Sequence, residues 1–183
     1  MYLISAYFDQ KTNEKIQGFI NKIAHKTGNT FMLDHQVPPH LTISAIETKE
    51  KETLISCIKG MERKFDLGEL QFVSVGSFFP YVLYLTPVLN EYLCRLSKQV
   101  YEELGDYDTF KVSRFYQPMQ WLPHITLGKK LTKPQLLEAF SIMQEEFVPF
   151  QGQVTALGLS KVKPYQEFLK IECESNKGER KWM

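Results

Sequence analysis

The same short motif occurs twice in this chain, at matching places in two halves. The copies are Pro39-His40-Leu41-Thr42-Ile43 and Pro123-His124-Ile125-Thr126-Leu127, with their histidines 84 residues apart. A glycine follows each at a similar interval: Gly76 lies 36 residues after His40, and Gly158 lies 34 residues after His124. Because a repeat determines how the rest of a sequence is interpreted, we expect two lobes related by an approximate two-fold axis.

Apolar periodicity and turn residues predict the same order of elements around each motif: strand, helix, His-x-Thr strand, helix and strand. The predicted strands are 2–8, 40–43, 71–79, 82–86, 123–127, 154–162 and 167–173. The predicted helices run from Asp9 to Gly28, from a cap at Thr48, over 87–105, and from a cap at Thr132. The segments 30–39 and 106–121 are predicted loops. We expect one bilobal domain over 1–183, with repeats of about 1–80 and 81–174.

Composition excludes several classes of protein. The 183 residues are 43% hydrophobic, which is enough for a hydrophobic core. The net charge is only +1, so we expect no overall electrostatic field that would attract DNA or an anionic membrane. The three cysteines, Cys57, Cys94 and Cys173, are far apart, which argues against a disulfide framework or a cysteine zinc site. Without a signal-peptide pattern or a membrane-length apolar run, we expect a soluble cytoplasmic protein, with neither DNA nor a membrane as its partner.

The motif residues suit phosphate-ester chemistry. In a strand, residues two apart point to the same face, so each motif presents one imidazole and one hydroxyl together. A neutral imidazole can take a proton from water or a ribose hydroxyl, and a protonated one can donate to the leaving oxygen, since the unperturbed histidine pKa is about 6.5. Threonine hydroxyls can donate to non-bridging phosphate oxygens. This scheme requires no metal or other cofactor.

Two alternatives compete with this interpretation. A single strand histidine is more often a structural residue, and threonine is a common strand former, although the repetition of the motif favours function. A zinc site is the second alternative, because Asp34 and His35 lie just before the first motif. Zinc usually takes three or four protein ligands, and no further ligand stands out. His25, near a helix end, is interpreted as structural.

The two motifs resemble the His-x-Thr-x signatures of the two-histidine phosphoesterase superfamily, which includes 2'-5' RNA ligase-like proteins and 2',3'-cyclic phosphodiesterases. The resemblance extends over essentially the whole chain. It implies an α+β bilobal duplicated fold, with two antiparallel sheets lining a central cleft and helices packed outside. It also implies His40 and His124 as the acid–base pair, Thr42 and Thr126 as phosphate-binding residues, and an RNA end or small nucleotide as substrate.

Other candidate residues lie near the motifs. Many ligase-like members carry arginine five residues after the second motif histidine, where this chain has Lys129; strand alternation instead points Lys130 to the site, and the choice stays open. Tyr165, Phe79 and Tyr81 lie at predicted turns and could stack on a base.

The predicted loop before the second motif combines aromatic and basic residues. Phe115, Tyr116 and Trp121 lie near Lys111 and Arg114. This mixture fits a nucleic-acid rim, or equally a loop whose aromatic rings pack on the core.

We therefore expect a monomeric, metal-independent phosphodiesterase that hydrolyses a 2',3'-cyclic phosphate or a 2'-5' linked phosphoester of RNA or a nucleotide. Both histidines would act as an acid–base pair in hydrolysis or, with their roles exchanged, in ligation. The alternative is a non-catalytic module that binds an RNA end or nucleotide at the same site.

Overall fold

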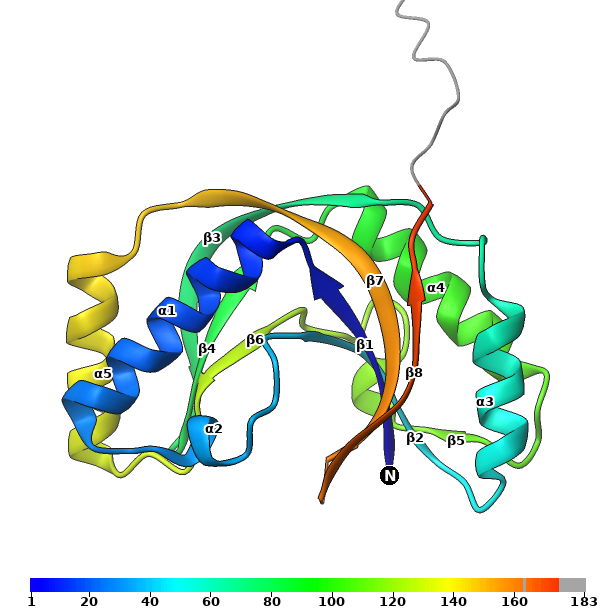
Figure 1. Ribbon diagram of the computed structural model, residues 1–183, viewed down its shortest axis with the longest axis horizontal. Coiled ribbons are helices and arrows are strands. Elements are labelled where there is room, and N and C mark those ends of the chain that lie inside the picture. The colour runs from blue at the N-terminus through cyan, green and yellow to red at the C-terminus, as the bar shows by residue number, and fades with distance from the viewer. Residues whose placement is uncertain (163, 175–183) are drawn as a thin grey trace, which may run out of the picture.

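The computed structural model describes residues 1–162 and 164–174 (Figure 1). The elements follow the predicted order, with short additions in both predicted loops. The strands are β1 (Tyr2–Phe8), β2 (Leu41–Glu47), β3 (Gly68–Phe78), β4 (Val82–Pro87), β5 (Lys111–Val112), β6 (Ile125–Gly128), β7 (Phe150–Val162) and β8 (Tyr165–Glu172). The helices are α1 (Gln10–Thr27), α2 (Phe31–Asp34), α3 (Lys51–Gly60), α4 (Glu91–Gly105) and α5 (Lys133–Glu146), with a 3-10 turn, η1 (Arg114–Tyr116).

The strands form one sheet of order β5-β2-β1-β7-β3-β4-β6, and β8 pairs with β7. Each of these neighbouring pairs runs antiparallel. The predicted α+β class is therefore confirmed. The two expected sheets are joined into one because β7, with 13 residues, is long enough to pair with both β1 and β3.

Each half of the sheet combines elements from both repeats. The His40 half, as we call β2, β1 and β8 with the part of β7 beside them, packs against α3 and α4. The His124 half, β6, β4 and β3, packs against α1 and α5, and Figure 1 shows these two helices together on one side. Strand β3 of the first repeat pairs with β4 of the second, while β7 of the second pairs with β1 of the first. The repeats are thus interleaved in space.

Local sequence explains where most helices begin. The Asp9 carboxylate accepts from the Thr12 amide and caps α1, while the left-handed residue Gly28 ends it at φ 70°. Thr132 and Gln135 form a capping box at α5, as predicted. Two predicted starts were wrong. Helix α4 does not begin at residue 87 but after its cap Asn90, and α3 begins after Glu50, whose amide donates to the Thr48 hydroxyl.

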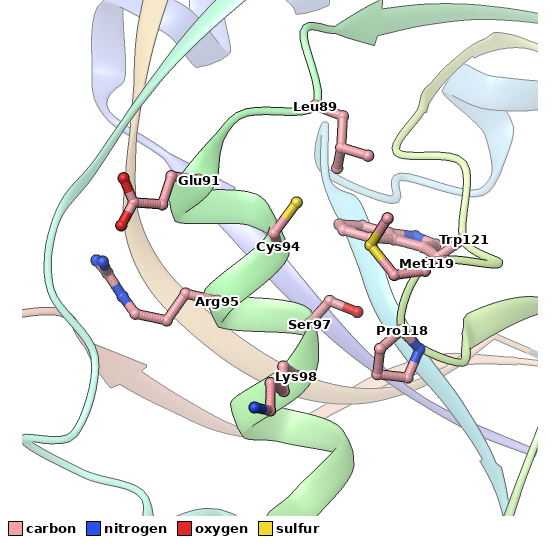
Figure 2. Close-up of a pocket in the computed structure, with 9 residues that line it drawn as sticks. All are labelled: Leu89, Glu91, Cys94, Arg95, Ser97, Lys98, Pro118, Met119 and Trp121. Carbon is pink, nitrogen blue, oxygen red and sulfur yellow. The ribbon is translucent and has the colours of Figure 1, made fainter.

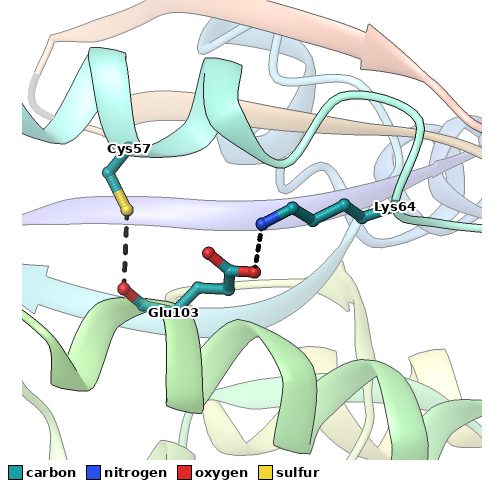
Figure 3. Close-up of polar contacts among 3 residues, drawn as sticks. All are labelled: Cys57, Lys64 and Glu103. Carbon is teal, nitrogen blue, oxygen red and sulfur yellow. Dashed lines mark hydrogen bonds and ion pairs between the residues drawn. The ribbon is translucent and has the colours of Figure 1, made fainter.

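The core lies between the helices and one face of the sheet. Its fully buried side chains come from strands of both halves, including Ile4, Ile43, Phe72 and Leu85. Helices α3 and α4 are also tied by polar contacts at their edge (Figure 3). The Cys57 thiol points to the Glu103 carbonyl, and the Glu103 carboxylate pairs with Lys64 just beyond α3.

No helix within the described ranges is both long enough and apolar enough to cross a membrane.

Candidate active site

The strand register places the two motifs in equivalent surroundings. Thr42 on β2 lies opposite Ser5 on β1, and Ser5 in turn lies opposite Gly158 on β7. Thr126 on β6 lies opposite Tyr84 on β4, and Tyr84 lies opposite Gly76 on β3. Directly opposed residues share a face of the sheet. In each half, the motif threonine, a residue of the neighbouring strand and one of the repeated glycines therefore form a row across three strands.

Both glycines are required because a tyrosine ring lies over each. A Cβ atom at Gly76 would stand 2.5 Å from the Tyr84 hydroxyl, and one at Gly158 would stand 2.4 Å from Cε2 of Tyr7. Any side chain would displace these rings. The same steric constraint, a tyrosine ring over the backbone, thus explains the matching glycines of the two sequence repeats.

Each motif histidine is oriented by a backbone carbonyl two residues before it. The His40 Nδ1 lies 2.9 Å from the Pro38 oxygen, and the His124 Nδ1 lies 2.9 Å from the Leu122 oxygen. A carbonyl can only accept, so Nδ1 carries the proton in each ring. In the neutral imidazole this leaves Nε2 as the free acceptor, which is the form a general base needs.

The electrostatics couple the two motif histidines. Burial lowers the pKa of His40, the Pro38 carbonyl opposes this, and the positive charges of His124 and Lys129 lower it further. Burial also lowers the pKa of His124, opposed by the Leu122 carbonyl. In the folded chain the charges of His124 and Lys129 thus act on His40, although both residues follow it in the sequence by more than 80 positions.

Lys129 and Lys130 diverge at the end of β6. Strand alternation stops at Gly128, and Lys130 has a left-handed backbone with φ 57°. Its ammonium lies 4.7 Å from the centre of the Phe31 ring, on α2. Of the two lysines left open by the sequence, Lys129 is the one whose charge acts on His40.

The two motif threonines differ in exposure. Thr42 is only 7% exposed, whereas Thr126 is half-buried. The segment before the second motif covers Thr42: the Trp121 indole donates to the Thr42 carbonyl at 3.0 Å. The Tyr116 hydroxyl lies against the Thr42 side chain, and this hydrogen bond partly offsets the rise in the Tyr116 pKa caused by burial. Trp121 and Tyr116 are thus packed inward, while Phe115 is exposed.

Two aromatic rings, Phe78 and Tyr84, pack against the His124 ring. Phe78 meets it edge-on with ring centres 4.8 Å apart, and Tyr84 lies 5.6 Å from it. The two aromatic rings are themselves 4.4 Å apart. Sequence reasoning missed both residues. Phe78 could have been found from alternation, because it lies two positions after Gly76 and therefore shares its face.

None of the three residues predicted to stack on a base is among the rings that contact His124. Phe79 and Tyr81 are at the β3–β4 turn and are 82% and 60% exposed, so their predicted role stays a prediction. Tyr165 starts β8, and its hydroxyl lies 3.4 Å from that of Tyr7 in the His40 half. Burial raises the pKa of both phenols.

A hollow of about 370 Å³ is lined in part by Trp121, the residue whose indole donates to the Thr42 carbonyl (Figure 2). It is formed between α4 and the segment before β6, and Cys94, Ser97 and Met119 are among its lining residues. None of the motif residues lines it. Trp121 therefore separates this hollow from Thr42.

The described residues offer no set of ligands for the alternative of a zinc site. Among residues 1–162 and 164–174, no three His, Cys, Asp or Glu side chains gather so that they could hold a metal ion. The Asp34 carboxylate instead accepts from the Thr30 hydroxyl, and His35 packs on Phe31 with ring centres 4.1 Å apart.

A duplicated α+β fold with one His-x-Thr strand in each half is the architecture of the two-histidine phosphoesterases, and the predicted class is confirmed by comparison with known proteins. The chain matches the 2'-5' RNA ligase superfamily over residues 12–164 and belongs to it. Membership indicates a phosphoesterase or ligase-like activity.

Individual relatives agree with this assignment. A protein of Geobacillus sp. (strain WCH70), named as a candidate phosphoesterase, is 26% identical over 149 residues, covering 78% of this chain and 79% of the relative. TT0787 of Thermus thermophilus has a TM-score of 0.62 and 15% identity, covering 96% of this chain and 98% of that one. LigT of E. coli, solved in complex with 3'-AMP, has a TM-score of 0.56 and 16% identity, with coverages of 95% and 98%. These two structures share the fold.

Proposed function

We propose that this protein is a metal-independent phosphodiesterase that hydrolyses 2',3'-cyclic phosphates or 2'-5' linked phosphoesters of RNA or nucleotides. The observation that carries the proposal is the pair of equivalent imidazoles. Both rings have Nδ1 bonded to a backbone carbonyl, and the charge of His124 acts on His40. A purely structural role would not require two histidines held in the same orientation by equivalent carbonyls.

In the proposed reaction, the free Nε2 of one histidine removes a proton from water as the water oxygen attacks phosphorus. The bond from phosphorus to one ribose oxygen breaks, and the other histidine, protonated, gives its proton to that oxygen. The pKa of each histidine is lowered in the free protein. The acid therefore depends on the bound phosphate, whose negative charge raises the pKa of a neighbouring imidazole.

The remaining site residues would hold the phosphate and the base. The hydroxyls of Thr42 and Thr126 would donate to the non-bridging oxygens, and the Lys129 ammonium would offset their charge as it increases in the transition state. The rings of Phe78 and Tyr84 offer an aromatic surface next to His124, suited to stacking on a nucleobase. The 3'-AMP bound to LigT in its structure supports a nucleotide ligand for this fold.

The test is turnover of 2',3'-cyclic nucleotides, a cyclic-phosphate-ended RNA and a 2'-5' linked dinucleotide in EDTA. Wild type, His40→Ala and His124→Ala are compared, with the exposed residue His25→Ala as matched control. We expect hydrolysis by wild type and His25→Ala, and a loss of about a hundredfold or more in each motif variant. Full loss of wild-type activity in EDTA would refute the metal-free scheme. Ligand binding without turnover on any substrate would instead establish the non-catalytic binding module.

A further inference from the structure

The hollow beside Trp121 lies between α4 and the segment that precedes β6 (Figure 2). Its volume of about 370 Å³ falls within the range of about 300–1,000 Å³ that is usual for small-molecule sites. Its apolar walls are formed by Leu89, Pro118, Met119 and Trp121. The hollow is therefore large enough, and apolar enough, to take up a small organic compound.

The hydroxyl of Ser97 is a polar group without a partner in this hollow. Ser97 is only 3% exposed, and its Oγ is one of four buried side-chain oxygens that have no hydrogen-bond partner among the described residues. The other three do not line the hollow. Figure 2 shows the Ser97 hydroxyl pointing from α4 toward Met119 and Pro118. Because a buried hydroxyl without a hydrogen bond costs stability, its position here indicates that a ligand supplies the missing polar atom.

The charged side chains at the margin of the hollow are directed elsewhere. Figure 2 shows Glu91 and Arg95 on the side of α4 that faces away from the segment before β6. The Arg95 guanidinium lies 3.8 Å from the Asp66 carboxylate, and the Lys98 ammonium lies 3.7 Å from the Glu102 carboxylate. Since these cations already have partners, an uncharged ligand matches the walls of the hollow best.

The side chains around the hollow favour an aromatic ligand. The Trp121 indole forms one wall, and the Cys94 thiol and the Met119 thioether are drawn near it in Figure 2. Aromatic rings pack well against other rings and against sulfur. Leu89 and Met119 are 44% and 82% exposed, so apolar surface is open to a ligand at this place.

Trp121 also contacts the first motif. Its indole N–H donates to the Thr42 carbonyl at 3.0 Å, and its side chain is buried. A ring that packs against the indole from the hollow therefore acts on a group that is hydrogen-bonded to Thr42.

We propose that the hollow binds a small, neutral aromatic compound that carries one hydrogen-bonding group, and that its binding alters the hydrogen bond from Trp121 to Thr42. The Ser97 hydroxyl bonds the polar group of the ligand, while the ring lies between Trp121 and Met119. None of the motif residues lines this site, and neither part of the inference depends on the proposed function.

The test is an NMR titration of the whole protein with two probes, phenol and toluene. Toluene has a methyl group in place of the phenol hydroxyl, so the pair isolates the hydrogen bond to the ligand. The Trp121 indole N–H resonance reports the hollow. The amide of Ile43, which follows the Thr42 carbonyl in the chain, reports the first motif. No turnover is measured, so failure of the proposed function would leave this test unaffected.

Three variants make the titration specific. Ser97→Ala removes the unpaired hydroxyl, and Leu89→Ala removes part of an apolar wall. Ser44→Ala is the matched control, because the Ser44 hydroxyl is also buried and without a partner among the described residues but lies outside the hollow. Melting temperatures of all variants are measured without ligand.

We expect phenol to shift both resonances with one dissociation constant of roughly 1–10 mM, as is usual for a ligand of so few atoms. Ser97→Ala should lower the ratio of phenol affinity to toluene affinity about two- to tenfold, because one neutral hydrogen bond is lost. It should melt no lower than wild type, since the hydroxyl that it removes is unpaired. Leu89→Ala should weaken the binding of both probes, and Ser44→Ala should keep the wild-type ratio.

Three results would overturn the proposal. Without a saturable shift of the Trp121 resonance, or with an unchanged affinity ratio in Ser97→Ala, the hollow is not the binding site proposed. A shift at Trp121 with none at Ile43 would refute the effect on Thr42. A lower melting temperature of Ser97→Ala would show that the hydroxyl already has a partner in the protein and needs none from a ligand.

Discussion

One backbone hydrogen bond at each motif histidine decides which ring nitrogen is available for chemistry. Because the carbonyl lies only two residues before the ring, the short Pro-His segment that enters each strand supplies its own orienting group. The second influence comes from distant residues: burial and the positive charges gathered at the site lower the pKa of His40. Local sequence therefore selects the tautomer, and the fold adjusts the proton affinity.

Replacing Lys129 by methionine should raise the pKa of His40 toward its ordinary value. The lysine charge disfavours the imidazolium, so its removal makes protonation easier. If His40 is the base, the acidic limb of the kcat/KM profile moves to higher pH by the same amount. NMR titration of the His40 ring measures the shift directly.

Two further lysine variants serve as controls for this titration. Lys129→Arg retains the charge and should keep the His40 pKa near the wild-type value. Lys130→Met removes a charge of the same kind that lies over Phe31 instead, and it should have little effect. A His40 pKa that is the same in Lys129→Met and in wild type would show that Lys129 does not act on this ring.

At the scale of elements, the segment from β5 to β6 connects the two motifs. Trp121 donates to the carbonyl of Thr42 in the first motif, and the next residue, Leu122, accepts from His124 in the second. The Thr86 hydroxyl on β4 then donates to the Pro123 carbonyl at 2.8 Å. This segment is a loop by sequence pattern, yet its bonds reach both halves of the sheet. It therefore sets the position of each motif relative to the other.

Strands β3 and β4 support the His124 ring through Gly76. In Gly76→Ala the new methyl would overlap the Tyr84 ring, which must move away from its place beside His124. We expect the free energy of unfolding to fall by about 1–3 kcal/mol, and kcat/KM on a cyclic phosphate to fall about ten- to a hundredfold. Urea denaturation and steady-state kinetics measure the two effects.

Gly158→Ala is the matched control for this substitution, because it creates a similar overlap with Tyr7 in the His40 half. A comparable loss of stability is expected, with a smaller loss of activity. If Gly76→Ala retained full activity and an unshifted His124 ring resonance, the proposed support of that ring by Tyr84 would be wrong.

For the whole molecule, the interleaving of the repeats predicts that neither folds alone. A fragment 1–80 contains β3 without its partners β4 and β7, and α1 without the α5 surface against which it packs. Long unpaired strand edges and an uncovered apolar face should leave each fragment unfolded. Circular dichroism and NMR spectra of fragments 1–80 and 81–183, alone and mixed, test this. A dispersed spectrum from either fragment alone would contradict the prediction.

Much of the fold could be predicted because its signals are local. The Asp9 and Thr132 caps, the Gly28 helix end and the alternation around each motif act within a few residues. The errors arose where longer-range contacts decide. Residues 111–112 form a strand only by pairing with β2, and the 13 residues of β7 exceed the predicted strand because β3 offers a second partner.

The sequence by itself determined the pair of motifs, the family they indicate, and the residue types proposed for the site, because the repeat and its spacing are visible along the chain. Tertiary structure alone decided which neighbours act on them. The backbone after Gly128, left-handed at Lys130, decides that it is the charge of Lys129 that lowers the pKa of His40. That Phe78 and Tyr84, not Phe79 or Tyr81, contact His124 depends on strand register. Register and charge proximity arise between segments far apart in sequence, so only the folded chain defines them.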